Sequence, residues 1–186
     1  MSDDFRAKWE PRIDHAQFAT SDKGDFEPNP SASISLPADR QAIVEAVISL
    51  YSAHPTEAAC LKYAKESVYD DPLSYCKNRT EIAGQWYGLP KTFQECKVLA
   101  HEVVVNDAEK VVLRLKTEYI GSWGSKVVTS IVVLALAEEE GELKIKYHKD
   151  LWSLDDYEHT GFGHAFKQFN AKAVPHILDL PDSLKV

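Results

Sequence analysis

The spacing of apolar residues changes in character close to residue 95. Before that point apolar positions recur every three or four residues, which is the period of an amphipathic helix. Three helices are predicted on this basis, over residues 37–54, 55–63 and 80–93. Pro37 and Asp39 suit the start of the first helix, and Pro90 disturbs the end of the third.

After residue 95 the period changes to that of strands, and in residues 111–120 and 142–152 apolar and polar residues alternate, which is typical of strands with one buried face. Four strand-like runs are separated by turn residues: residues 97–107, 110–121, 126–139 and 142–153. A lone strand is predicted over residues 67–76, between the second and third helices. The order of helices, one strand, a helix and an antiparallel meander indicates the α+β class.

The two ends of the chain differ from this middle part. Residues 1–36 show no sustained period and contain three prolines, so we expect an arm that is either disordered or draped over the domain. Trp9, Phe18 and Phe26 are its candidate anchors. Residues 37–186 then form one domain, and Phe162, Phe166 and Phe169 predict a C-terminal helix that closes its core.

Two segments carry a resemblance to a known family. Residues 62–87, KYAKESVYDDPLSYCKNRTEIAGQWY, join an aromatic-ended helix, a strand, an Asp-Pro pair and a helix start; residues 141–153, GELKIKYHKDLWS, end in His, Lys, Asp, Leu, Trp and Ser. They resemble the nuclear-transport-factor-2-like (NTF2-like) superfamily, and particularly uncharacterised fungal members of its SnoaL-like branch. The resemblance implies a cone-shaped fold, with N-terminal helices packed on a curved antiparallel sheet and a C-terminal helix.

Asp71 is the first candidate catalytic residue. Tyr69, Asp71, Leu73 and Tyr75 share one side of the predicted strand, and this more apolar side should face the interior, with Asp70 directed to solvent. Burial would raise the pKa of the Asp71 carboxyl towards neutrality, where it can take a proton. The alternative is structural, with Asp71 accepting a hydrogen bond from a backbone amide or a tyrosine. The similarity to ketosteroid isomerases, whose base is the aspartate of an Asp-Pro pair, implies the catalytic role.

His148 and Asp150, near the end of the last strand, have two interpretations. Simple alternation places them on the charged outer face, opposite Ile145 and Tyr147. The similarity to SnoaL-like proteins places them near the mouth of a cavity, as an acid–base pair. Tyr147, the inward Tyr119, or Tyr51 of the first helix could then donate a hydrogen bond to an oxyanion.

Aromatic residues suggest a hydrophobic pocket. Tyr75 and Trp86 could line it together with the tyrosines named above, although packing in the core is the alternative. Glycines around His164 lack the preceding strand of a nucleotide-binding motif, and the histidines lack metal-ligand spacing, so neither a cofactor nor a metal is expected.

Composition narrows the remaining choices. A net charge of -8 argues against nucleic acid as a partner, and three widely spaced cysteines suit reduced thiols. No apolar run approaches the roughly 20 residues of a membrane span. The first residues are charged and show no secretory signal, so we expect a cytoplasmic protein.

These observations leave three functional hypotheses. One is a cofactor-free isomerase, dehydratase or cyclase that acts on a small hydrophobic molecule by acid–base catalysis. Another is a non-catalytic module that binds a small molecule or a protein in the same cavity. The presence of an acid in the cavity should discriminate between these two. A third hypothesis, a structural role as a dimerising interaction protein, would show as a filled cone with no pocket. A homodimer through the outer face of the sheet is expected in each case.

Overall fold

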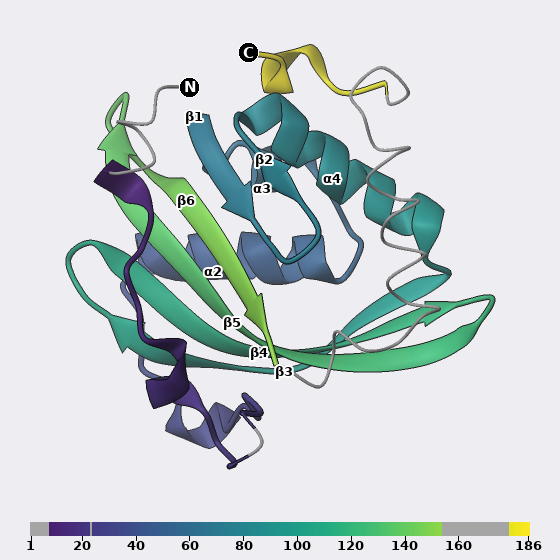
Figure 1. The fold of residues 1–186 in the computed structure, drawn as a ribbon. Coiled ribbons are helices and arrows are strands. Elements are labelled where there is room, and N and C mark those ends of the chain that lie inside the picture. The colour runs from purple at the N-terminus through teal and green to yellow at the C-terminus, as the bar shows by residue number, and fades with distance from the viewer. Residues whose placement is uncertain (1–7, 23, 154–178) are drawn as a thin grey trace.

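The computed structural model describes residues 8–22, 24–153 and 179–186 (Figure 1). Its helices are α2 (Ala38–Tyr51), α3 (Glu57–Cys60) and α4 (Arg79–Thr92), and its short 3-10 turns are η1 (His15–Phe18), η2 (Pro30–Ala32) and η4 (Asp182–Leu184). Its strands are β1 (Tyr63–Asp70), β2 (Tyr75–Cys76), β3 (Glu95–Asn106), β4 (Lys110–Gly121), β5 (Gly124–Glu139) and β6 (Glu142–Trp152). The α+β class predicted from the hydrophobic pattern is confirmed.

The strands form a six-stranded sheet in the order β2-β1-β6-β5-β4-β3 among the described residues. The four long strands β3 to β6 are the four predicted from alternation, and they pair antiparallel as a meander. The lone strand β1 pairs in parallel with β6 and so adds to the far side of that meander. The sheet curves strongly around the helices, as Figure 1 shows.

The predicted strand over residues 67–76 is instead two short strands joined by a tight turn. The Asp71 amide donates to the Ser74 carbonyl over 3.0 Å, which closes the turn. Asp71 Oδ1 in turn accepts from the amides of Leu73 and Ser74, at 2.7 and 2.5 Å. Pro72 fits inside this turn because its missing N–H leaves no donor to satisfy. The single-strand interpretation was therefore wrong beyond Asp70.

Helices α2 and α4 cover the concave side of the sheet (Figure 1). Their apolar faces meet the inward side chains of the strands in one core cluster, which includes Ile43, Val47, Leu50, Ile82, Trp86, Leu113, Leu134 and Ile145. The Asn78 side chain caps α4 by accepting from the Glu81 amide at 2.9 Å. These contacts fix the two helices that supply part of the site.

The described part of the N-terminal arm lies on the other, outer side of the sheet. Phe26 is only 2% exposed and packs with the outward side chains of Val112, Ile131 and Val133. The Asn29 amide adds a hydrogen bond to Glu102 at 2.8 Å. These contacts place the described part of the arm against the sheet, and the division of the chain into an arm and a domain stays a prediction.

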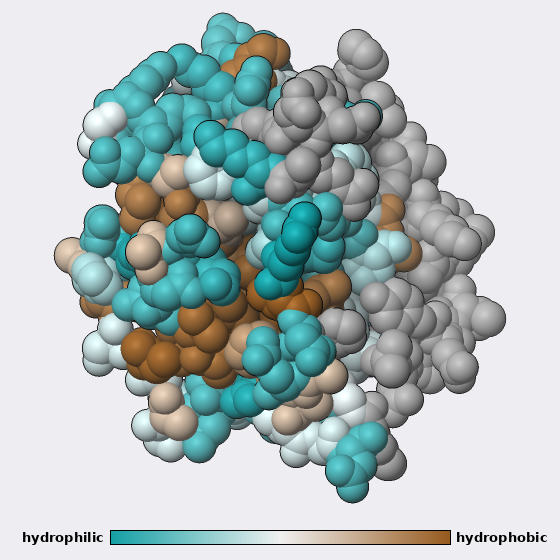
Figure 2. Space-filling view, turned by 60° about the vertical axis from the view of Figure 1, so that its left-hand side comes forward, coloured by the Kyte–Doolittle hydropathy of each residue, from teal (hydrophilic) through white to brown (hydrophobic). Residues whose placement is uncertain are grey.

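The outer face that carries the arm is the face on which a homodimer was expected. Figure 2 shows apolar residues reaching the surface there between strongly polar ones. Because the arm already packs across β4 and β5, part of this face is occupied by the chain itself. The homodimer stays a prediction.

The predicted C-terminal helix with Phe162, Phe166 and Phe169 lies outside the described residues. The described end of the chain instead forms η4, where Leu184 is fully buried and joins the main core cluster. Within the ranges that the structure describes, no helix combines the length and hydrophobicity needed to cross a membrane.

Candidate active site

β6 has one extra residue relative to β5, and this residue determines which side chains of β6 point into the interior. Ala135 of β5 pairs with Tyr147, but the next residue, Leu136, pairs with Ile145, so Lys146 has no partner across the ladder. Such a β-bulge reverses the sides on which all later residues of the strand point. His148, Asp150 and Trp152 therefore face the interior, while Tyr147 faces outwards.

This bulge corrects the interpretation drawn from simple alternation. His148 is fully buried and Asp150 is 2% exposed, so neither lies on a charged outer face. Tyr147, expected on the inner face, packs outside with Val68 and donates its hydroxyl proton to Asp70 at 2.9 Å. Tyr147 is thus on the wrong side of the sheet to act as an oxyanion donor in the cavity.

The inward side chains of β6 form a chain of hydrogen bonds with two buried tyrosines. The Tyr51 hydroxyl, from the last residue of α2, donates to Asp150 Oδ2 at 2.7 Å and lies 3.1 Å from His148 Nε2. The Tyr63 hydroxyl, from the first residue of β1, lies 2.8 Å from His148 Nδ1. Trp152 Nε1 also donates to Asp150 Oδ2, at 3.2 Å.

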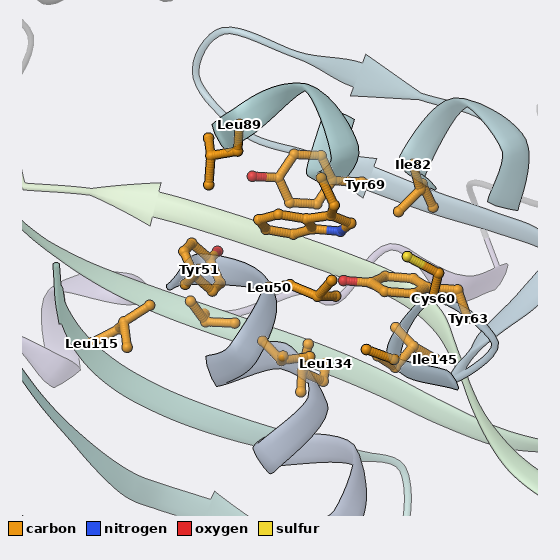
Figure 3. Packing of buried hydrophobic residues seen from close by; sticks show 14 of the residues in the cluster. Leu50, Tyr51, Cys60, Tyr63, Tyr69, Ile82, Leu89, Leu115, Leu134 and Ile145 are labelled. Carbon is orange, nitrogen blue, oxygen red and sulfur yellow. The ribbon is translucent and has the colours of Figure 1, made fainter. Parts of the chain in front are cut away.

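The tyrosines of this network sit among the apolar residues of the core (Figure 3). Tyr51, Tyr63 and Tyr69 are each 5% exposed or less. Tyr69 meets His148 edge to face, with ring centroids 4.8 Å apart, and Trp86 packs edge to face against Tyr51 at 5.1 Å. These aromatic contacts hold the polar groups rigidly in an environment that is poor in water.

Asp150 and Asp71 share one small cavity at the end of this network. It is lined by Tyr51, Tyr69, Asp71, Gln85, Trp86, Leu89, Tyr119, Asp150 and Trp152. Its volume is about 20 Å³, which is room for about one water molecule without rearrangement. The lining thus combines five aromatic rings with two carboxyl groups.

Burial shifts the ionisation of both carboxyl groups towards neutrality. It raises the pKa of Asp150 to about 6, although hydrogen bonds from Tyr51 and Trp152 favour the charged form. Burial and, second, the negative charge of Asp150 together raise the pKa of Asp71 to about 7, although hydrogen bonds from Tyr69 and from the amides of Leu73 and Ser74 favour its charged form. Part of the Asp71 residue is exposed, but protein atoms surround its carboxyl group.

Burial acts on the other titratable groups in the direction that keeps them neutral. It lowers the pKa of His148 to about 3, so the imidazole is uncharged at neutral pH. It raises the pKa of Tyr51 and Tyr119 well above the usual range, and the charge of Asp150 adds to both shifts. At pH 7 the only charges available in the cavity lining are therefore those of the two aspartates.

The two carboxyl oxygens of Asp150 differ in their hydrogen bonds. Oδ2 accepts from both Tyr51 and Trp152, whereas buried Oδ1 has no hydrogen-bond partner of good geometry among the described residues. The nearby Ser130 hydroxyl favours the charged carboxylate without reaching that geometry. A buried acceptor without a partner is unusual in a native protein and often marks a functional group.

No family model matches the sequence, and no curated protein matches it. The fold does match solved structures. A protein of unknown function from Mycobacterium tuberculosis has a TM-score of 0.54 and 10% identity, covering 73% of this chain and 86% of that chain. A putative SnoaL-like polyketide cyclase from Shewanella putrefaciens has a TM-score of 0.51 and 13% identity, covering 65% and 83%. A putative scytalone dehydratase from Novosphingobium aromaticivorans also has a TM-score of 0.51, with 10% identity, covering 62% and 81%.

The chain has an NTF2-like fold. Its neighbours include SnoaL-like and ketosteroid-isomerase-like structures, so the resemblance read from the sequence is confirmed at the level of fold. At 10–16% identity the likeness establishes the architecture, and the activity has to be argued from the site. The similarity to fungal members stays a prediction.

The NTF2-like fold brings most of the expected site residues together. Asp71, Asp150, Tyr51, Trp86 and Tyr119 all line the cavity. His148 does not line the cavity, but its side chain contacts Tyr51, which does.

Three residues depart from expectation or were missed. Tyr75 is 40% exposed, because the turn after Asp71 carries it out of the predicted strand. Tyr63 was assigned to a helix, but α3 ends at Cys60 and Tyr63 opens β1. Trp152 was missed, because simple alternation gives it the same outer side as Asp150, and the bulge at Lys146 that turns it inwards is not visible in the sequence.

Within residues 8–22, 24–153 and 179–186, no three His, Cys, Asp or Glu side chains are arranged to hold an ion. The three cysteines are buried as free thiols, and burial raises the pKa of Cys60 to about 12, which makes that thiol a poor nucleophile.

Proposed function

We propose that this NTF2-like chain is a cofactor-free acid–base enzyme of the isomerase, dehydratase or cyclase type, acting on a small, mostly apolar molecule. One observation carries the proposal. Two carboxyl groups, those of Asp71 and Asp150, line the same aromatic cavity, with pKa values raised to about 7 and about 6. Perturbed carboxyl groups in a hollow are the expected equipment for proton transfer near neutral pH.

The two pKa values assign different roles to the two acids. Between about pH 6 and pH 7 Asp150 is mainly ionised while Asp71 is mainly protonated, so the cavity holds a base and an acid together. Asp150 then takes a proton from a carbon of the substrate, and Asp71 gives its proton to the oxygen that gains the electrons. The family resemblance makes Asp71 the base, but the open oxygen Oδ1 of Asp150 favours Asp150 in that role, since Oδ1 of Asp71 already accepts from two backbone amides.

The lining also suits the electronic demands of that reaction. Oδ1 of Asp150 is the open acceptor, since Oδ2 is held by Tyr51 and Trp152. The pKa of Tyr119 is raised well above its usual range, so its hydroxyl keeps its proton and can stabilise a developing oxyanion. Because the cavity has room for about one water molecule, the reacting end of a substrate, such as a carbonyl and its neighbouring carbon, enters it only when the lining side chains move.

The non-catalytic alternative calls for a different interior. A pure binding module would present an apolar or simply hydrogen-bonding cavity, with its acids outside. Here Asp150 is 2% exposed, and burying its charge costs free energy. A protein that only binds an apolar ligand does not need this buried charge.

Hydrogen–deuterium exchange at carbon tests the proposal without a known substrate. A panel of small cyclic and aryl ketones is incubated with the protein in D₂O at pH 6.5, and loss of the proton next to the carbonyl is followed by NMR. We expect exchange above the buffer rate for part of the panel, reduced about a hundredfold in Asp150→Asn and Asp71→Asn.

Asp70→Asn is the matched control for this experiment. Asp70 is the immediate neighbour of Asp71, but it accepts from the outward Tyr147, so its substitution should leave the exchange rate unchanged. Exchange at the buffer rate throughout the panel, or full exchange in both cavity variants, would contradict the proposed activity.

A further inference from the structure

The hydrogen bonds behind the cavity have a direction that the positions of the atoms determine. The Tyr51 hydroxyl has a single proton and two polar neighbours, Asp150 Oδ2 at 2.7 Å and His148 Nε2 at 3.1 Å. A carboxylate can only accept hydrogen bonds. With Asp150 ionised, the Tyr51 proton must therefore lie on the bond to Asp150.

This assignment fixes the protonation of His148. Since the Tyr51 proton is used on Asp150, the Tyr51 oxygen can only accept from His148 Nε2, which must then carry a proton. A neutral imidazole has one N–H, so Nδ1 is the unprotonated nitrogen and accepts from the Tyr63 hydroxyl at 2.8 Å. The hydrogen bonds run in one direction, from Tyr63 to His148 to Tyr51 to Asp150.

His148 is therefore occupied on both ring nitrogens. It is fully buried, and it is absent from the cavity lining. The aromatic rings of Tyr63 and Tyr69 pack against it, at centroid distances of 6.0 and 4.8 Å. A group so enclosed can orient its neighbours but has no route to a substrate atom.

We propose that His148 and Tyr63 are positioning residues, which hold the Tyr51 hydroxyl on Asp150 Oδ2 and leave Oδ1 as the atom that receives the proton. The catalytic meaning of this arrangement rests on the proposed function, whereas the direction of the hydrogen bonds does not. Each bond in such a row polarises the next, so the donation from Tyr51 to the carboxylate is strengthened. The proposal removes His148 from the acid–base role that its place beside Asp150 suggests.

The protonation state of His148 can be observed directly in the intact protein. Long-range ¹H–¹⁵N NMR at pH 8, assigned by loss of signals in His148→Gln, shows which ring nitrogen carries the proton. We expect a neutral imidazole protonated at Nε2 and unprotonated at Nδ1. A proton on Nδ1, or on both nitrogens, would overturn the proposal.

Two substitutions separate positioning from proton transfer. In His148→Gln the side-chain amide can still donate to the Tyr51 oxygen but cannot titrate, and in His148→Leu the donor is lost. We expect the Asp150 pKa, measured by ¹³C NMR of its carboxyl carbon, to stay unchanged in the Gln variant and to rise by about half a pH unit in the Leu variant. Equal shifts in the two variants would contradict a positioning role.

Tyr147→Phe is the matched control, because it removes a hydroxyl from the residue next to His148 on the opposite face of the sheet. It should alter neither the protonation of His148 nor the Asp150 pKa. None of these readouts needs a substrate. If they come out as expected while carbon–deuterium exchange is absent, the proposed function fails alone; if exchange is present while Nδ1 carries the proton, the positioning proposal fails alone.

Discussion

Asp150→Asn should be more stable than the natural protein at pH 8. The difference between their free energies of unfolding should be about 3 kcal/mol more favourable to the variant at pH 8 than at pH 4. The reason is the cost of the buried charge. The folded-state pKa of Asp150 is raised from 3.8 to about 6, so its contribution to stability is present below about pH 4 and is lost as the pH rises through 6. The asparagine side chain keeps an oxygen that can accept from Tyr51 and Trp152, and it has no charge to bury.

The neighbouring groups do not change the sign of this effect. The depressed pKa of His148 makes both proteins lose stability as the pH falls below about 6.5, and this cancels in the difference. The negative charge of Asp150 contributes to the raised pKa of Asp71, so removing that charge also makes Asp71 easier to ionise. Both consequences of the substitution favour the variant at pH 8.

Urea unfolding at pH 4 and pH 8 measures the effect as a free energy. Asp70→Asn is the comparison, because Asp70 lies on the outer side beside Lys149, with 3.5 Å between the charged atoms, and removing its charge should bring no gain at pH 8. A loss of stability in Asp150→Asn at pH 8 would show that the carboxylate is well solvated or paired, and that the cavity is not the environment described above.

Phe26→Ala should lower the free energy of unfolding by about 3 kcal/mol. Phe26 is 2% exposed, although it belongs to the arm, and its ring fills a cluster with Val112, Ile131 and Val133 on the outer face of the sheet. Removing the ring takes away its transfer free energy and leaves a cavity against the strands. The arm then contributes to the stability of the strands whose inner side chains line the core.

Phe18→Ala provides the matched control in the same arm. Phe18 packs at the edge of the same cluster but is only partly buried, so its truncation should cost about 1 kcal/mol. Urea unfolding of the two variants, with circular dichroism as the probe, makes the comparison. Equal and small effects would show that the arm does not dock through Phe26.

The long strands follow from local pattern, whereas Asp71 reaches the cavity from the turn after β1 and not from the predicted strand. Alternation over residues 110–121 is long enough to specify which face is buried, and the structure pairs β4 and β5 without a register shift. Residues 131–137 are apolar throughout, and residues 131–136 are buried on both faces of the sheet. Periodicity works where a strand is regular from end to end.

The position of Asp150 could not be derived in this way, because a single extra residue reverses alternation. Lys146 is bulged in the pairing of β6 with β5, and the register between β1 and β6 also shifts, between Tyr63 and Val68. Those pairings are properties of the folded sheet. The resemblance of residues 141–153 to SnoaL-like proteins, unlike alternation, placed Asp150 at a cavity.

Tyr63 illustrates a second limit of local reasoning. An aromatic residue after a short helical segment reads as its last turn, and nothing nearby shows that it meets a histidine 85 positions further along the chain. The hydrogen-bond partners of Tyr51 are likewise remote, 97 and 99 positions away. Networks of this kind depend on the closed fold, and a sequence pattern cannot predict their partners.

The carboxyl titration of the natural protein tests the central claim most directly. ¹³C NMR of the aspartate side chains, assigned through Asp71→Asn and Asp150→Asn, gives each pKa in the folded state. Two aspartates that titrate near neutrality, Asp150 at about 6 and Asp71 at about 7, are the result that a shared aromatic cavity predicts. Titration of both near the ordinary value of about 4 would contradict it, because carboxyl groups with that pKa are hydrated or paired with a cation.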